Sequence, residues 1–364
     1  MGRKKKKLRI SKKTKEVIIG IICLIVLYLL AEFGVLEKID KAIEKTGLAE
    51  IVDTRETSVI ETTPQVKTNT EIIEKVSENI LIDQNKLNIL FLDVGQADCQ
   101  LILYKGKSML IDAGNSGDGE YIVNGIKALG ITNLDYVIGT HVHEDHIGGM
   151  SYIIDSFEIG EFYLPYNTTS TTSYYKKLLT SLTNKEETIN EVNVGDKIIF
   201  EDINFEIMSV DNSEPENTNA SSIVLEMTYG ELKYLFMADA EKENEEARKW
   251  NDVDVLKVGH HGSNTSSTEE FLNQVLPEIS VISVGEGNSY ELPKDKILKR
   301  LEKIGSIIYR TDNDGTIQII SDGKTNEVVK IDVNFDSSQT IRWFRGRRKK
   351  SCFSNFFDDF WLRP

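Results

Sequence analysis

The sequence of 364 residues is poor in cysteine and histidine, and it has no internal repeat. Its three cysteines, Cys23, Cys99 and Cys352, fall in an apolar segment, a predicted core strand and a basic tail. This distribution excludes the disulfide framework that stabilises small secreted scaffolds. The core of the protein must therefore come from ordinary packing of apolar side chains.

Only one long hydrophobic run is present, so the sequence contains no polytopic transport region. The run starts at Val17 and reaches Leu36 with Glu32 as its single charge, and its 20 residues are close to the length that spans a bilayer. Residues 1–16 carry nine Lys or Arg and a net charge of +8. The positive-inside rule predicts a basic cytoplasmic segment at 1–16, a transmembrane signal anchor at 17–36 and a catalytic domain outside the cytoplasm, in a single-pass protein of the cell membrane. A cleaved signal peptide is less favoured, because no clear A-x-A site follows the run.

Two further segments flank the predicted catalytic domain at residues 87–333. Residues 37–86 form an acidic spacer, rich in threonine over 54–70, that would hold the domain off the membrane. Residues 334–364 form a tail with basic and aromatic side chains concentrated at 342–350. This composition is suited to binding an anionic surface, either lipid headgroups or a polyphosphate. It is equally typical of a disordered tail without a partner.

The predicted domain alternates strand-like and helix-like segments, with more strands than helices, and this pattern indicates an α/β fold. Apolar runs predict strands at 87–94, 98–104, 107–113, 203–210, 221–228, 232–238, 253–259, 279–284, 306–311 and 315–320. Helices are predicted at 119–129, 147–156, 172–183, 241–250, 268–276 and 294–304.

Histidine is scarce but concentrated, since three of the five histidines lie in the six residues 141–146. His141 and His143 follow an apolar strand two positions apart, so both imidazoles can bind one ion from the same side of the chain. Asp145 and His146 are then free to bind a second ion. Three histidines and a carboxylate in one short loop predict a two-metal site, and a chance cluster of solvated histidines is much less probable.

The remaining ligands must come from other strands that end nearby. Asp239 ends the apolar strand 232–238, which suits a carboxylate that bridges two cations, although alone it would be taken for a helix N-cap. His260 and His261 end the strand 253–259, and a surface turn is the alternative there. These residues complete the set of candidate metal ligands.

Several motifs resemble a known family. Residues 140–149 (THVHEDHIGG) resemble the signature loop of the metallo-β-lactamase superfamily. Residues 92–98 (LDVGQAD), 256–263 (LKVGHHGS) and 309–315 (YRTDNDG) more narrowly resemble the β-lactamase-like domain of the ComEC competence proteins. The resemblance covers residues 87 to about 322.

The resemblance implies a four-layer αββα sandwich with a dinuclear metal centre at one edge, with zinc expected first and manganese as the alternative. It assigns one ion to His141 and His143 and the other to Asp145 and His146, with a carboxylate bridge and a further imidazole. By the same resemblance Asp239 would be the bridge, and His260 would join the second ion. His261 would then donate a proton or hold a substrate oxyanion, although the two adjacent histidines remain interchangeable in sequence.

The chain departs from the family pattern in two places. The superfamily usually supplies a third histidine to the first ion from the middle of the chain, but no histidine occurs between His146 and His260. Asn219 and Ser222 are at the related position and are expected to line the site for substrate, and an oxygen-richer shell favours manganese. Leu292 stands where ComEC-like domains tend to have a histidine, so a substrate contact is missing.

Charge bears on the substrate. Residues 87–341 carry a net charge of −23, which is unfavourable for a long polyanion because nucleic-acid affinity depends on cationic contacts to phosphates. Lys257 and Arg310 are the candidates for a basic groove beside the site, and each is as readily an ordinary ion-pair residue.

The sequence therefore predicts a membrane-anchored metallo-hydrolase in which a hydroxide activated by two metals attacks the substrate. Asp145 and His261 are the expected catalytic residues. A phosphodiester is the preferred substrate, either DNA or a cell-envelope polymer, and DNA uptake would need a separate channel protein. The alternatives are hydrolysis of lactams, esters or thioesters, a catalytically silent metal-containing binding module and, most remotely, a di-iron oxidoreductase.

Overall fold

The computed structural model describes residues 82–166, 169–211 and 217–331. The predicted basic segment, membrane anchor and most of the spacer lie outside these residues, as does nearly all of the C-terminal tail. Within the described residues, no helix has the length and apolar character needed to cross a membrane. All of the described residues belong to the compact unit that contains the predicted catalytic domain.

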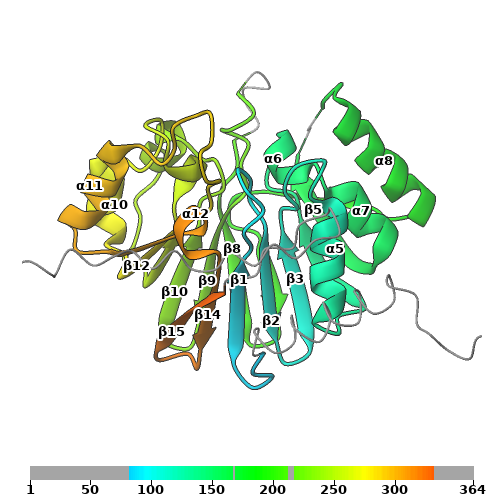
Figure 1. The fold of residues 1–364 in the computed structure, drawn as a ribbon, viewed down its shortest axis with the longest axis horizontal. Coiled ribbons are helices and arrows are strands. Elements are labelled where there is room, and N and C mark those ends of the chain that lie inside the picture. Colours follow the sequence, from blue (N-terminus) through cyan, green and yellow to red (C-terminus); the bar gives the residue numbers. More distant parts are fainter. Residues whose placement is uncertain (1–81, 167–168, 212–216, 332–364) are drawn as a thin grey trace, which may run out of the picture. The chain divides into compact units, whose positions relative to one another are not determined.

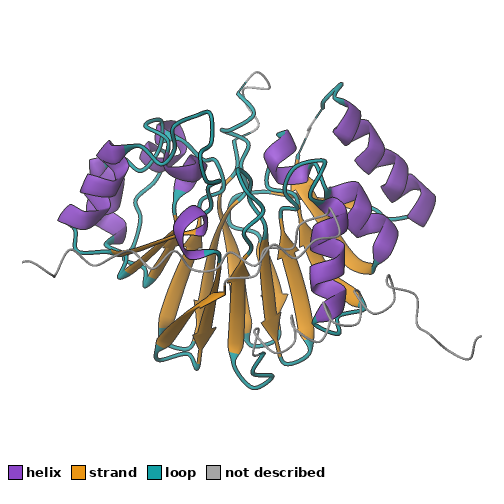
Figure 2. Cartoon of the chain, in the orientation of Figure 1, coloured by secondary structure: helices purple, strands orange, loops and turns teal. Residues whose placement is uncertain are grey.

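Two mixed β-sheets form the centre of this unit (Figures 1 and 2). The first has eight strands in the order β15-β14-β1-β2-β3-β4-β5-β6, and the second has seven in the order β13-β12-β11-β10-β9-β8-β7. In the first sheet the strands are β1 Leu87–Phe91, β2 Gln100–Tyr104, β3 Lys107–Ile111, β4 Asn133–Ile138, β5 Glu158–Pro165, β6 Ile189–Val192, β14 Thr316–Ser321 and β15 Asn326–Ile331. In the second they are β7 Lys197–Phe200, β8 Ile203–Ser209, β9 Val224–Tyr229, β10 Leu232–Phe236, β11 Val255–Lys257, β12 Ile279–Ile282 and β13 Ile307–Arg310.

Helices cover the outer face of each sheet (Figure 1). The first sheet is covered by α5 Gly119–Ala128, α7 Met150–Ser156 and α8 Ser173–Lys185, and the short α6 Glu144–Ile147 precedes α7. The second sheet is covered chiefly by α10 Glu269–Val275 and α11 Asp295–Lys303, with the short helices α9 Lys242–Glu246, η1 Gly259–Gly262 and α12 Thr311–Asp314 at strand ends.

Three apolar cores hold these layers together. One lies between the first sheet and its helices and includes Leu101, Ile126 and Ile153. The second lies between the two sheets, and the third lies between the second sheet and its helices. Apolar side chains on both faces explain why strands such as β1 and β2 are buried at every position. The layers run helix, sheet, sheet, helix, which is the αββα arrangement expected from the sequence.

Each sheet is antiparallel in one half and parallel in the other. Strands β3 to β6 are parallel in the first sheet, and β10 to β13 are parallel in the second. Open sheets of this kind bind ligands beyond the carboxyl ends of their parallel strands. The segments that follow β3, β4, β10, β11 and β12 are therefore the ones in which functional side chains are expected.

Candidate metal centre

Five strand ends supply the polar side chains of the candidate site, as the parallel halves of the sheets predict. Asp112 follows β3, and residues 139–147 follow β4 and end in α6. Asp239 follows β10, the histidine pair lies in η1 after β11, and Ser283 follows β12. The predicted ligands thus reach one place from both sheets.

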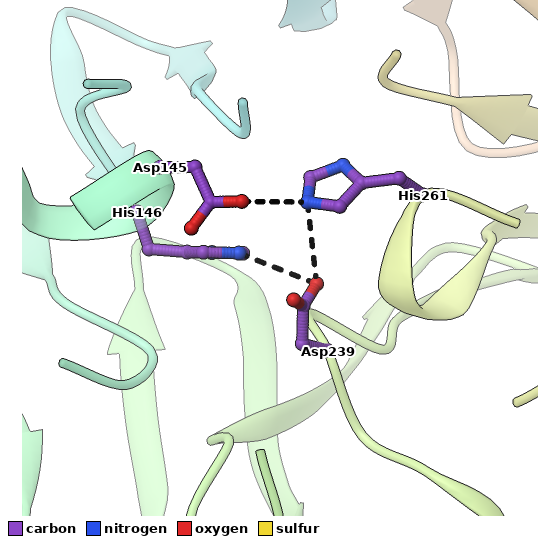
Figure 3. A group of neighbouring side chains, drawn as sticks. All are labelled: Asp145, His146, Asp239 and His261. Carbon is purple, nitrogen blue, oxygen red and sulfur yellow. Dashed lines mark ion pairs between the residues drawn. The ribbon is translucent and has the colours of Figure 1, made fainter. Parts of the chain in front are cut away.

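Four predicted residues converge into one group: Asp145, His146, Asp239 and His261 (Figure 3). Nε2 of His146 lies 3.2 Å and Nε2 of His261 lies 3.5 Å from Oδ1 of Asp239. Nε2 of His261 also lies 3.4 Å from Oδ2 of Asp145. All but Asp145 are almost fully buried. One ligand atom from each residue lies within 4.8 Å of the others, which suits a single cation.

A second group shares Asp239 with the first and consists of His141, His143 and Asp239. Nε2 of His141 lies 3.1 Å from Nδ1 of His143 and 3.9 Å from Oδ2 of Asp239. Asp239 therefore offers one carboxylate oxygen to each group. This is the arrangement that a bridging ligand of two cations requires.

Protein oxygens fix the orientation of two of the histidine rings. Nδ1 of His146 lies 2.7 Å from Oδ2 of Asp112, and Nδ1 of His261 donates to the carbonyl of Ser283 at 2.8 Å. In each case the other ring nitrogen, Nε2, is directed at Asp239. Metal-binding histidines are typically held in this way by a carboxylate or a carbonyl behind them.

Three buried ligand atoms face one another without forming a hydrogen bond, and this arrangement fits a divalent cation. Nε2 of His146, Nε2 of His261 and Oδ1 of Asp239 are buried, and none has a hydrogen-bond partner in the described residues. Buried polar atoms are rarely left without a partner, and a cation bound between them would satisfy all three. The donor set of nitrogens and carboxylate oxygens suits zinc and manganese alike.

The pKa values of His146 and His141 shift in opposite directions. Burial opposes protonation of His146, but the carboxylates of Asp239 and Asp112 outweigh it and hold its pKa well above the usual value. Burial and the neighbouring His146 hold the pKa of His141 well below its usual value. Burial would raise the pKa of Asp239, but His146 and His261 hold it well below the usual range. These shifts favour an ionised Asp239, and a cation that binds here competes with protons for the histidine nitrogens.

The backbone around the site is strained. Asp112, Ala238, His260 and His261 all have positive φ angles between 47° and 59°, a region that non-glycine residues seldom adopt. Such conformations cost free energy and cluster at functional sites. In η1, the left-handed backbone of His260 and His261 directs their two imidazoles to different sides of the site.

The two adjacent histidines take positions opposite to those expected from the sequence. His261 is the buried member of the group around Asp145, where His260 was expected, and His260 lies outside that group with 24% of its side chain exposed. The reason is the left-handed backbone of both residues, which the sequence does not reveal. His261 therefore replaces His260 as the predicted ligand of the second ion.

Ser222 and Asn219 also differ from the sequence-based expectation. Ser222 is fully buried, and its Oγ lies 3.4 Å from Nδ1 of His141 and accepts from the Asp239 amide at 3.3 Å. It therefore supports two ligands from behind and cannot touch substrate. Asn219 is half-buried, and its Nδ2 donates to Glu241 Oε1 at 3.2 Å.

The structure leaves no basic groove at the two predicted positions. Nζ of Lys257 is 2.8 Å from Oδ2 of Asp98, and both side chains are 1% exposed. Arg310 forms a two-pronged pair with Asp312. The negative charge of the domain is therefore not relieved by Lys257 or Arg310.

Leu292, at the position where the resemblance led us to expect a histidine, packs against the third core.

Sequence reasoning did not single out Asp112 or Ser283. Asp112 lies near the end of the predicted strand 107–113, so a carboxylate near a strand end was the available signal. Ser283 acts through its backbone carbonyl, for which no side-chain signal exists.

Comparisons with known proteins agree with this geometry. Residues 92–286 match the family model described as the metallo-beta-lactamase superfamily. The chain is 35% identical over 197 residues to ComE operon protein 3 of Bacillus subtilis (strain 168), covering 53% of this chain and 25% of that protein. It is 32% identical over 235 residues to Recombination protein 2 of Haemophilus influenzae, covering 63% of this chain and 28% of that protein. The match thus spans only about a quarter of each relative.

Solved structures are similar at lower identity. One is the metallo-beta-lactamase fold protein YhfI from Bacillus subtilis, with 10% identity, a TM-score of 0.44 and coverage of 65% of this chain and 100% of that one. The match to the family model covers more than half of the sequence and includes every residue of both metal-binding groups. The chain therefore belongs to the metallo-β-lactamase superfamily and is related to the ComEC-like competence proteins.

Proposed function

We propose that the protein is a membrane-anchored, metal-dependent phosphodiesterase whose catalytic domain lies outside the cytoplasm. The observation that carries the proposal is that Asp239 is shared between two groups of buried histidines and carboxylates. A pair of cations at a shared carboxylate suits the in-line displacement at phosphorus, because both the attacking and the leaving oxygen need stabilisation.

The side chains of this protein have separate parts in that reaction. Bound divalent cations supply Lewis acidity and lower the pKa of a bound water. Asp112 and the carbonyl of Ser283 keep His146 and His261 turned toward Asp239. Asp145 is partly exposed beside His261, so it borders the face from which substrate enters. His141, His146, Asp239 and His261 are almost fully buried, and this burial strengthens the electrostatic contacts between them.

Two observations point to different phosphodiesters. One relative is named ComE operon protein 3 and another Recombination protein 2; the second name supports DNA as the substrate, and a separate channel protein would then be the partner in uptake. The net charge of −23 over residues 87–341 supports a small or envelope-bound phosphodiester instead. Hydrolysis of lactams, esters or thioesters and a silent binding role remain the alternatives to phosphodiester cleavage.

The test uses the full chain purified in mild detergent and loaded separately with zinc and manganese. Its substrates are bis-p-nitrophenyl phosphate and single-stranded DNA, and its variants are Asp145→Ala and His146→Ala. The control is Asp155→Ala, which removes an exposed carboxylate on α7. We expect metal-dependent cleavage that both site variants lose and the control keeps. Two bound ions without cleavage of either substrate would refute a phosphodiesterase and turn attention to lactams, esters or binding.

A further inference from the structure

His260 lies outside the two groups of ligands, yet its ring faces the shared carboxylate. The two oxygens of Asp239 have different neighbours. Oδ1 faces His146 and His261 at 3.2 and 3.5 Å, whereas Oδ2 faces His141 at 3.9 Å and His260 at 3.6 Å, in each case measured to Nε2. His260 is therefore on the side of the first ion, not on the side of the second.

The length of a metal–ligand bond limits how far apart two ligand atoms of one ion can lie. Two atoms that each bind one ion at about 2.1 Å lie at most about 4.2 Å apart. Both His141 and His260 are within that limit of Oδ2 of Asp239. Nε2 of His141 and Nδ1 of His143, which are 3.1 Å apart, are also within this limit. His141, His143 and His260 thus surround the Oδ2 side of Asp239, but His260 is in no group whose ligand atoms all lie within 4.8 Å of one another, so its ring must move toward the other two to bind the same ion.

The ring of His260 is held in this direction by oxygens behind it. Its Nδ1 lies 2.9 Å from Oγ1 of Thr265 and 3.1 Å from Oε1 of Glu241. Glu241 is itself fixed, since Nδ2 of Asn219 donates to the same oxygen at 3.2 Å. A carboxylate behind one ring nitrogen with the other directed at the site is the usual support of a metal-binding histidine.

The backbone of His260 is also fixed. Its amide donates to the carbonyl of Ala238 at 2.9 Å, next to Asp239, and its carbonyl accepts from the amide of Ser263 at 2.8 Å. The strained φ of 48° thus persists because both neighbouring turns hold it. The cost of this conformation in η1 implies that the position of the ring matters.

We propose that His260 supplies the third nitrogen ligand of the first ion, with Glu241 and Asn219 as the residues that position it. The superfamily takes this ligand from a histidine in the middle of the chain. Here the related position holds Ser222, which is buried behind His141. The inference rests on the metal-dependent function proposed above, and it adds which residue completes the centre.

The test is calorimetric titration of the metal-free full chain with zinc, in mild detergent. The variants are His260→Ala, His260→Gln, His141→Ala, His261→Ala and the doubles His141→Ala/His260→Ala and His261→Ala/His260→Ala. We expect His260→Ala and His260→Gln to keep one ion at wild-type affinity and to bind the other at least about tenfold more weakly. Glu241→Gln should weaken the same ion to a smaller extent.

The double variants identify which ion is affected. His260→Ala should add little to His141→Ala, because both remove ligands of one ion, but it should weaken the remaining ion in His261→Ala. Two ions bound by both His260 variants at wild-type affinity would overturn the inference, and a loss of hydrolysis in such variants would assign His260 to the substrate instead. A wild-type chain that binds no ion would overturn the proposed function as well. Circular dichroism of each variant separates loss of a ligand from loss of the fold.

Discussion

At the scale of single residues, the site depends on what lies behind each ligand. Asp112 receives the amide and hydroxyl of Thr140 at 2.8 and 2.7 Å, and it holds His146 at 2.7 Å. Its carboxylate is buried, and burial raises its pKa although His146 opposes the shift. The Asp112 carboxylate thus fixes both the backbone after β4 and the tautomer of His146.

We expect Asp112→Asn to weaken binding of the second ion by about 10- to 100-fold, because the amide cannot accept from both Thr140 and His146 in the same way. Zinc titration of the variant measures the effect. Asp155→Asn makes the same chemical change at an exposed position of α7 and should leave the affinity unchanged. Equal affinities for the two variants would show that Asp112 does not orient His146.

The residue scale also shows what the sequence can and cannot predict. His141, His143, Asp145 and His146 lie within six residues, so local spacing is enough to predict their convergence. The order of His260 and His261 depends on left-handed backbone angles, and Ser222 could be placed behind His141 only by the packing of two sheets. Such details depend on tertiary contacts that no local pattern contains.

At the scale of elements, a buried ion pair joins the two sheets beneath the site. Asp98 lies in the β1–β2 connection of the first sheet, and Lys257 ends β11 of the second. The amide of Asp98 also donates to the carbonyl of Asp145 at 3.0 Å. The pair therefore connects the loop that carries Asp145 to the strand that leads into His260 and His261.

We expect Lys257→Met to lower the free energy of unfolding by about 3–5 kcal/mol, because it leaves the buried Asp98 carboxylate without its partner. Asp98→Asn combined with Lys257→Met should cost less than the sum of the two single changes. Urea unfolding measures both. Lys105→Met is the matched control, since Lys105 pairs with Asp202 at the same 2.8 Å but on the surface, and it should have little effect. A small effect of Lys257→Met as well would contradict this role.

Gly148 and Gly149 are needed because neighbouring backbone approaches them closely, and not because they adopt left-handed angles. Both have ordinary right-handed angles. A Cβ on Gly149 would lie 2.2 Å from the carbonyl oxygen of Ala113 and 3.0 Å from the Cα of Gly119. The start of α7 is thus packed directly on the backbone beside Asp112.

We therefore expect Gly149→Ala to lower the free energy of unfolding by about 1–3 kcal/mol or more through overpacking. Gly117→Ala provides the control, because a Cβ there meets no atom within 4 Å. Thermal unfolding of the two variants gives the comparison. A Gly149→Ala variant as stable as Gly117→Ala would mean that the two segments are not in contact.

Strands were predicted from sequence mainly where they are buried, and most of the strands that were missed are partly exposed. All ten predicted strands and all six predicted helices overlap observed elements. The apolar strand expected just before His141 is β4, and the four remaining strands, β5, β6, β7 and β15, were missed; all four have exposed or half-buried positions. Three of these lie at sheet edges, where exposed polar side chains are typical and the apolar signal is weak.

At the scale of the whole molecule, charge is the feature that bears most on the substrate. The net charge of −23 over residues 87–341 repels a polyanion, and the two basic candidates beside the site are held in ion pairs. The cations of the metal centre attract a phosphate only over a short range, because salt screens charges beyond about 10 Å. DNA must therefore approach against the field of the domain.

We expect the KM for single-stranded DNA to fall or stay constant as sodium chloride rises from about 50 to about 200 mM, because screening weakens this repulsion. Initial rates of DNA cleavage measure it, and the KM for bis-p-nitrophenyl phosphate should hardly change. A KM for DNA that rises steeply with salt would instead reveal cationic contacts along the strand and would favour a nuclease with a basic groove.

The metal content of the full chain tests the central claim most directly. The wild-type protein, Asp239→Asn and Asp155→Asn are saturated with zinc or manganese, separated from free metal by gel filtration and measured by atomic emission. We predict two ions per chain for the wild type and for Asp155→Asn, and fewer than one for Asp239→Asn, because Asp239 is the carboxylate that both groups share. A wild type without ions, or an Asp239→Asn variant that keeps both, would contradict a two-metal centre bridged by Asp239.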